Sequence, residues 1–267
     1  MSYTIDHDVH VHTTLSACCG DLNATPANII ARAAQAGLKT IGFADHLWDS
    51  AMPGAMDWYR PQDLPHVLQT RALLPADCRG VRVLVGCESE YCGDGKVGIS
   101  SQAASQLDFV LLPISHFHMR GFVVPADLHA PDAIARLLVT RFNQAVGLGL
   151  ATGIAHPFFP LGHEARLDEI HSLISDDVFA AGFARAAANG VSIEISTIMF
   201  PDCCGQGAAF KDETFLRMLR IAKRNGCCFH FASDSHELAG IGRVLKLAPV
   251  ADELGLAEQD IHPRFRS

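Results

Sequence analysis

Two histidines stand one residue apart close to the amino terminus, in the run Asp8-Val9-His10-Val11-His12. If this run is a β-strand, alternate side chains share a face, so His10 and His12 point the same way. Neutral imidazoles offer nitrogen lone pairs at physiological pH, which makes such a pair half of a divalent-metal site. An isolated pair is equally compatible with two solvent-facing histidines on an edge strand. The other metal-binding residue types must decide between these interpretations.

Six further side chains of metal-binding type each follow a short apolar run. They are His46, Glu88, His116, His156, Asp234 and His236. At random positions such residues would fall on helices and on the loops before helices as often as at strand ends. Their recurrence therefore predicts a shared rim. The other histidines show no such pattern, and we expect surface or core roles for His7, His66, His118, His129, His163, His171, His230 and His262.

The apolar runs have the length of buried strands and alternate with helical patterns. Seven strands are predicted, near 8–13, 40–44, 82–87, 109–114, 150–155, 190–195 and 227–232. Helices are predicted over 26–36, with Thr25 as N-cap and Gly37 as the stop, and over 64–74, 131–146, 176–188 and 214–224. This alternation predicts an α/β fold whose parallel sheet closes into a (β/α) barrel, with functional groups at the carboxyl ends of the strands.

Length and composition narrow the class of protein. A chain of 267 residues fits one barrel and contains no linker or low-complexity tract, so we expect a single domain over residues 1–267. Hydrophobic residues make up 49% and charged residues 19%, which excludes a disordered chain. No apolar run is long enough to span a bilayer, and the first residues lack the basic and apolar regions of a signal peptide. We expect a cytoplasmic protein.

Charge and cysteine usage exclude other classes. The formal net charge is −8 and the basic residues are scattered, so nothing indicates an extended surface for nucleic acid. The nine cysteines are odd in number, include adjacent pairs and contain no Cys-x-x-Cys motif. This pattern is poor for a disulfide framework or a zinc ribbon.

The order of the motifs resembles the PHP family, named for polymerase and histidinol phosphatase. The resemblance covers nearly the full chain and rests on His10-x-His12, Asp45-His46, Gly86-Cys87-Glu88, Ser115-His116, Ala155-His156-Pro157 and Ser233-Asp234-Ser235-His236. It implies a distorted seven-stranded TIM-like (β/α) barrel that binds two or three divalent metal ions, usually zinc, manganese or iron, and hydrolyses phosphoesters.

The same resemblance implies a role for each rim residue. The first metal would be held by His10, His12, Glu88 and Asp234, and the second by a bridging Glu88 with His116 and His156. His46 and His236 would hold a third metal with one residue of the loop after His12. Glu88, Asp234 and His236 are the implied catalytic residues.

That loop departs from the family pattern, which usually has a His or Asp there. The matching position holds Cys18, and a thiolate binds zinc well and manganese poorly. Cys19 and Asp21 stay open as alternatives. Occupancy of the third metal site depends on which of them faces the rim.

Supporting and substrate-binding residues are less specific. Asp45 and Ser115 are candidates to orient the neighbouring imidazoles, with turn and capping roles equally open. Glu194 resembles a family Glu on the sixth strand that lies near the metals without binding them. The candidate phosphate-binding cations are Arg60, Arg120, Lys211 and Arg243, each of which is also compatible with a solvated surface position.

The expected function is hydrolysis of the phosphate monoester of a small metabolite, histidinol phosphate being one candidate. A hydroxide bridging two or three divalent metals would be the nucleophile. One alternative is a metal-dependent amidohydrolase, whose barrels also begin with His-x-His but typically use a bridging Lys, and no predicted strand here ends in Lys. The other is a non-catalytic metal-binding protein. We expect a small phosphorylated substrate and neither nucleic acid nor membrane as partner.

Overall fold

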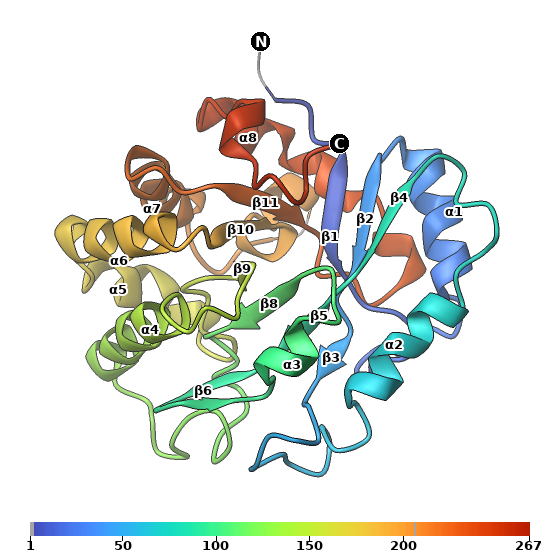
Figure 1. The fold of residues 1–267 in the computed structure, drawn as a ribbon. Helices are drawn as coiled ribbons and strands as arrows, with labels where there is room; N and C mark the ends of the chain where they lie inside the picture. The colour runs from blue at the N-terminus through green and yellow to red at the C-terminus, as the bar shows by residue number, and fades with distance from the viewer. Residues whose placement is uncertain (1–2, 206) are drawn as a thin grey trace.

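Parallel β-strands form the centre of the structure, and helices cover them on the outside (Figure 1). The computed structural model describes residues 3–205 and 207–267. The first two residues, which belong to the amino-terminal segment without signal-peptide character, lie outside the described residues. The parallel strands are β1 (His7–Val11), β2 (Thr40–Phe43), β3 (His46–Leu47), β4 (Arg82–Val85), β5 (Cys87–Ser89), β8 (Val110–Pro113), β9 (Gly153–Ala155), β10 (Ser192–Ser196) and β11 (Phe229–Ala232). The predicted α/β fold with a parallel sheet is confirmed.

The strands pair in two sheets, in the orders β1-β2-β4 and β11-β10-β9-β8-β5-β3. The strand predicted near 82–87 is split at Gly86 into β4, which pairs with β2, and β5, which pairs with β3 and β8. A Cβ atom at Gly86 would lie 2.6 Å from the Phe109 ring, so only glycine fits there. The split places Glu88 on the second sheet, opposite His46 of β3.

The first and last strands lie side by side without forming a continuous ladder. A single isolated bridge joins the end of β1 to the loop after β11. Elsewhere along this seam, side chains of β1 replace backbone carbonyls as acceptors. The backbone N–H of Phe231 donates to His7 Nε2 at 3.0 Å, and that of Ser233 donates to Asp8 Oδ1 at 2.9 Å. Among the described residues, the fully hydrogen-bonded closure predicted for a barrel is not seen.

The helices follow the predicted pattern closely where it is strong. They are α1 (Pro26–Ala36), α2 (Leu64–Ala72), α3 (Ser101–Ala104), α4 (Pro131–Ala145), α5 (Leu167–Ser172), α6 (Asp176–Ala188), α7 (Asp212–Arg224) and α8 (Ala248–Glu253). Thr25 caps α1 by accepting from the N–H of Asn28 at 3.3 Å, and Gly37 ends the helix at a φ of 83°. Both boundary predictions for α1 are confirmed, as are the bounds of α6.

Short elements were not predicted. They are the two-residue strand β3, the antiparallel pair β6 (Tyr91–Gly93) and β7 (Lys96–Val97), and the helices α3, α5 and α8. Each is too short to show a hydrophobic period. In the described parts of the chain, no helix combines the length and the apolar character needed to cross a membrane.

Candidate metal centre

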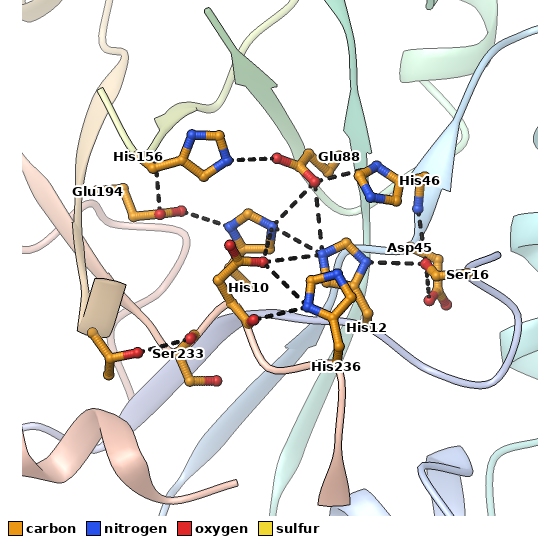
Figure 2. Close-up of polar contacts among 12 residues, drawn as sticks. His10, His12, Ser16, Asp45, His46, Glu88, His156, Glu194, Ser233 and His236 are labelled. Atoms are coloured by element: carbon orange, nitrogen blue, oxygen red, sulfur yellow. Dashed lines mark hydrogen bonds and ion pairs between the residues drawn. The ribbon is translucent and has the colours of Figure 1, made fainter. Parts of the chain in front are cut away.

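The structure brings the predicted rim side chains into one cluster, which is buried except for the partly exposed Asp234 and His236. They come from β1 and its end, from β3 and β5, and from the loops after β8, β9 and β11. Figure 2 shows His10, His12, His46 and His156 turned toward Glu88, with His236 beside them. Strand order, and not sequence proximity, creates this arrangement, because parallel strands carry their carboxyl ends to the same side.

Glu88 occupies the middle of the cluster and is 1% exposed. Its Oε2 lies 3.4 Å from His10 Nε2, 3.6 Å from His12 Nε2 and 3.2 Å from His46 Nδ1. Its Oε1 lies 3.0 Å from His156 Nε2 and 3.5 Å from His116 Nε2. The two oxygens therefore face two different sets of imidazoles, as a carboxylate that bridges two cations must.

Asp234 faces His10 and His12 of the first of these sets from the loop after β11. Its Oδ1 lies 3.3 Å from His12 Nε2 and 3.5 Å from His10 Nε2. The backbone of Asp234 has a φ of 52°, and that of His156 has a φ of 28°, values that side-chain-bearing residues rarely adopt. Strained backbone of this kind persists where the surrounding structure holds a functional side chain in place.

Acceptors behind the cluster determine which nitrogen carries the proton in His10 and His12. His10 Nδ1 donates to Glu194 Oε2 at 2.8 Å. Ser16 Oγ donates to Asp45 at 2.8 Å, so it accepts from His12 Nδ1 at 3.0 Å. Each imidazole therefore presents an Nε2 lone pair to the centre.

His156 and His116 are oriented in the same way. Ser115 Oγ donates to the His156 carbonyl at 3.1 Å, so it accepts from His156 Nδ1 at 2.8 Å. His116 Nδ1 donates to Glu90 Oε2 at 2.6 Å. Metal-bound histidines in proteins are held by such bonds at the nitrogen that does not bind the metal.

The residues present fit a group of divalent metal ions. His10 Nε2 and His12 Nε2 lie 3.2 Å apart with both lone pairs directed inward, next to the carboxylates of Glu88 and Asp234. These lone pairs and negative charges repel one another unless a cation or protons lie between them. Three groups, two of which share His12, have donor atoms close enough to share an ion: His10, His12 and Asp234; Glu88, His116 and His156; and His12, Cys18, His46 and His236.

The electrostatics of the buried cluster keep its carboxylates ionised. Burial raises the pKa of the Glu88 carboxyl, but the imidazoles of His10, His116 and His46 outweigh burial and hold that pKa well below its usual value. Burial lowers the pKa of His10, yet Glu194 and the two central carboxylates outweigh it and raise that pKa well above its usual value. Protons therefore compete with a metal ion at His10 and not at the carboxylates.

In the loop after His12, Cys18 belongs to the group with His12, His46 and His236. Cys19 lies differently, because its Sγ donates to the His236 carbonyl at 3.1 Å. Asp21 is turned away, with Oδ2 accepting from the N–H of Leu238 at 2.9 Å. Among the described residues, Cys18 is therefore the one of these three alternatives whose side chain lies at the cluster.

The candidate phosphate-binding cations are not brought to the cluster. A cavity of about 560 Å³ borders it, and none of these cations is among the described residues that line the cavity. Lys211 is the N-cap residue of α7. The three arginine side chains contact partners outside the cavity. Arg60 pairs with Asp57 at 2.9 Å, Arg120 contacts His129 at 3.0 Å and Arg243 pairs with Glu237 at 2.7 Å.

Sequence reasoning missed Glu90. Glu90 is fully buried and follows Glu88 by two residues, so the alternation of a strand puts both on one face. That Glu-x-Glu spacing was the available signal. His230 on β11 was expected to have a surface or core role, and it lies inside the structure, with Nε2 3.4 Å from Glu194 Oε2 and Nδ1 2.9 Å from Ser192 Oγ.

Replacement of Glu90 tests its orienting role. We expect Glu90→Leu to weaken metal binding by about 10- to 100-fold, because His116 loses the acceptor that fixes its tautomer and ring plane. The measurement is metal affinity by titration calorimetry on the apoprotein. Tyr59→Phe is the matched control, since it removes the 3.0 Å hydrogen bond from Tyr59 to Glu90 and leaves the Glu90–His116 bond in place. Unchanged affinity in Glu90→Leu would contradict the role.

Comparison with known proteins agrees with the motifs. A model of the PHP domain family matches residues 8–194. A probable phosphatase of Aliivibrio fischeri is 26% identical over 250 residues, which cover 94% of this chain and 85% of the relative. A probable phosphatase of Clostridium botulinum is 23% identical over 260 residues, which cover 97% and 89% of the two chains.

A solved structure shares the fold. It is the histidinol phosphate phosphatase of Lactococcus lactis in complex with zinc, L-histidinol and phosphate, with a TM-score of 0.59 and 18% identity. The match covers 92% of this chain and 93% of that protein. Because the family model spans well over half of the sequence, the resemblance inferred from the motifs is confirmed, and this chain belongs to the PHP domain family.

Proposed function

We propose that this protein is a metal-dependent phosphatase that hydrolyses the phosphate monoester of a small metabolite and binds two or three divalent metal ions. The observation that carries the proposal is that Nε2 atoms of several histidines face the two oxygens of Glu88, while Nδ1 of the same imidazole is hydrogen-bonded to another residue. These histidines are His10, His12, His116 and His156. Curated relatives that match nearly the whole chain are named probable phosphatases, which supports the same reaction class.

The three donor groups support the assignment of ligands. His10, His12, Glu88 and Asp234 would hold one metal, and Glu88, His116 and His156 a second. His46, His236 and Cys18, with His12 at the border, would hold a third. Zinc, manganese and iron are the proposed candidates. A site with one thiol and several imidazoles favours zinc, whereas nitrogen and oxygen donors also accept manganese.

Bound divalent metal ions supply positive charge to the phosphoryl oxygens and lower the pKa of a water molecule. The protein residues prepare the site for this chemistry. Glu194 and the Ser16–Asp45 pair keep a proton on Nδ1 of His10 and His12, so both Nε2 atoms are free to bind. Glu90 and Ser115 do the same for His116 and His156. Glu88, Asp234 and His236 are the proposed catalytic residues, since all three reach the cavity.

The architecture supports a single catalytic domain that comprises the whole given sequence. We propose that the strands form a distorted seven-stranded barrel, in which β2 with β3 and β4 with β5 each act as one interrupted strand. The adjacency of β1 and β11 supports closure. Ligands come from positions 10 to 236, so residues 1–267 are proposed to act as a single catalytic domain.

Two other functions are less well supported. A bridging Lys, typical of amidohydrolases, has no counterpart among the described residues of the cavity, and Glu88 lies where the bridge would be. A protein that binds metal without catalysis has no need for the cavity that opens onto the cluster. The phosphatase accounts for both features.

Turnover of 4-nitrophenyl phosphate by purified protein separates these functions. The metal-free protein is loaded with zinc, manganese or iron(II) in turn and assayed with this ester and with a 4-nitroanilide. We expect hydrolysis of the phosphate ester with at least one metal and none of the anilide. Bound metal without turnover of either compound would favour the non-catalytic protein, and turnover of the anilide alone would favour the amidohydrolase.

Cys18 can be tested through metal content. We expect Cys18→Ser to retain fewer zinc ions per chain than the wild type, because a hydroxyl is a much weaker zinc ligand than a thiolate. Substitution with cobalt(II) gives a second readout, the near-ultraviolet thiolate-to-cobalt absorption, which the variant should lack. Cys19→Ser is the matched control and should keep both. Equal metal content and equal absorption in the two variants would remove Cys18 from the ligand set.

A further inference from the structure

The wall of the cavity next to the metal centre is apolar and uncharged. Above the metal-binding side chains it is lined by Met56, Trp58, Tyr59, Met119 and Leu161, together with His118. The described residues that line it include no Lys or Arg, and no carboxylate other than Glu88 and Asp234. The lining therefore offers apolar surface and aromatic rings to whatever lies beyond the phosphate.

This wall is a packed structure and not a loose loop. Tyr59 is 1% exposed, and its hydroxyl donates to Glu90 at 3.0 Å. Phe122, from the loop after β8, packs on Tyr59 with ring centroids 5.9 Å apart and on Trp48 at 5.4 Å. Trp58 meets the ring of His46 edge-on at 5.1 Å. These contacts hold Trp58 and Tyr59, from the loop after β3, at fixed positions beside the proposed ligands.

Cations close to the wall are held outside the cavity. Lys96 is one example, because its Nζ lies 4.0 Å from the centroid of the Phe122 ring and 5.6 Å from that of the Trp48 ring. It therefore covers the packed aromatic layer and does not line the cavity. Arg60, Arg120 and Arg243 have the partners described above. A second anionic group on a substrate would find no cation among the lining residues, and an ammonium group would find only the metal-binding carboxylates.

We propose that the preferred substrate is a phosphate monoester of an uncharged alcohol with an aromatic or bulky apolar group. This inference rests on the proposed function. The P–O bond to the alcohol breaks, the oxygen of one water molecule bonds to phosphorus, and one water proton passes to the departing alkoxide, giving the alcohol and inorganic phosphate. The apolar group packs against Trp58, Met119 and Leu161.

Two physical effects lead us to expect that the cavity favours apolar leaving groups over charged ones. An apolar pocket binds an apolar group by the area it removes from water, and a charged group placed there loses its hydration without gaining an oppositely charged side chain other than the proposed metal ligands. Polar groups that lose their partners in a site reduce kcat/KM far more than a missing methylene does. The anionic and cationic leaving groups should therefore be rejected, including that of histidinol phosphate, which carries an amine.

The test compares primary alkyl phosphates, so that differences in leaving-group reactivity stay small. The holoenzyme is assayed with 2-phenylethyl phosphate, phosphoethanolamine, 3-phosphoglycerate and histidinol phosphate by release of inorganic phosphate. We expect kcat/KM for 2-phenylethyl phosphate to exceed that for each charged ester by about tenfold or more. Equal values, or a higher value for any charged ester, would overturn the inference while leaving the phosphatase intact. Failure of all four esters, and of 4-nitrophenyl phosphate, would instead overturn the proposed function.

Lysine substitutions in the cavity wall test the substrate preference in a second, independent way. Leu161→Lys and Met119→Lys are expected to lower kcat/KM for 2-phenylethyl phosphate by about tenfold and to raise it for 3-phosphoglycerate by about tenfold, which reverses the order of the two substrates. Leu173→Lys is the matched control, because Leu173 is 53% exposed and does not line this cavity. Metal content is measured for each variant to exclude loss of the centre. An unchanged substrate order in both wall variants with full metal content would contradict the assignment of this wall to the leaving group.

Discussion

The Glu88→Ala variant is expected to lose bound metal and phosphate-ester hydrolysis together. Glu88 is the side chain that faces both imidazole sets, with Oε2 near His10 and His46 and Oε1 near His156 and His116. Removal of a bridging carboxylate weakens two metal sites at once, and metal charge contributes several kcal/mol to the transition state. We expect kcat/KM to fall by roughly a thousandfold or more.

Elemental analysis of the purified variant is the decisive measurement, with far-ultraviolet circular dichroism to verify the fold. Glu169→Ala is a suitable control, because Glu169 is an exposed carboxylate paired with Arg166 on the surface. It should keep both metal and activity. A full complement of metal in Glu88→Ala would rule out the bridging role, whatever its activity.

Removal of the metal ions is expected to lower the melting temperature by roughly 10 °C. Without cations, the carboxylates of Glu88 and Asp234 lie next to the inward nitrogens of His10 and His12, and a proton on His10 compensates only part of their negative charge. A ligand present at a thousand times its dissociation constant stabilises the folded state by about 4 kcal/mol, and each kcal/mol shifts the midpoint by about 2–4 °C in a chain of this size.

Differential scanning fluorimetry before and after chelation, followed by addition of zinc or manganese, measures this effect. The Glu88→Ala variant serves as the control, because a variant that holds no metal should show no shift on chelation. An equal shift in that variant would mean that the chelator acts elsewhere. A wild-type midpoint unchanged after verified metal removal would show that the cluster is stable without cations.

The convergence of the candidate ligands could be predicted because each of them is tied to a strand end. Glu88, His116 and His156 directly follow or end apolar runs, and parallel strands must carry these ends to one side. The helix bounds were predictable where capping residues mark them, as Thr25 and Gly37 do for α1. Local sequence thus determined the elements and, through them, the neighbourhood of the site.

Side-chain direction in loops was not predictable, because it depends on partners distant in sequence. Arg60 and Arg243 are held by Asp57 and Glu237, and no strand pattern reports which way a loop arginine turns. The role of Glu90 was not predicted for the same reason, because it depends on a hydrogen bond from His116 that forms only in the folded chain. The hydrogen-bonded closure that the sequence predicted is not seen among the described residues, because the side chains of His7 and Asp8 accept hydrogen bonds between β1 and β11 where a ladder would use backbone carbonyls.

The seam between β1 and β11 has a consequence for biosynthesis. The donor group of His10, His12 and Asp234 joins the first strand to the loop after the last one, so it cannot be complete on a nascent chain until residue 234 has been made. Contacts between such distant segments also form late in folding. The group of Glu88, His116 and His156 uses neither end of the chain and is complete earlier. We therefore expect that a metal ion present during synthesis can meet only this one complete group, and that the two groups that include Asp234 or His236 are completed once the loop after β11 lies beside β1.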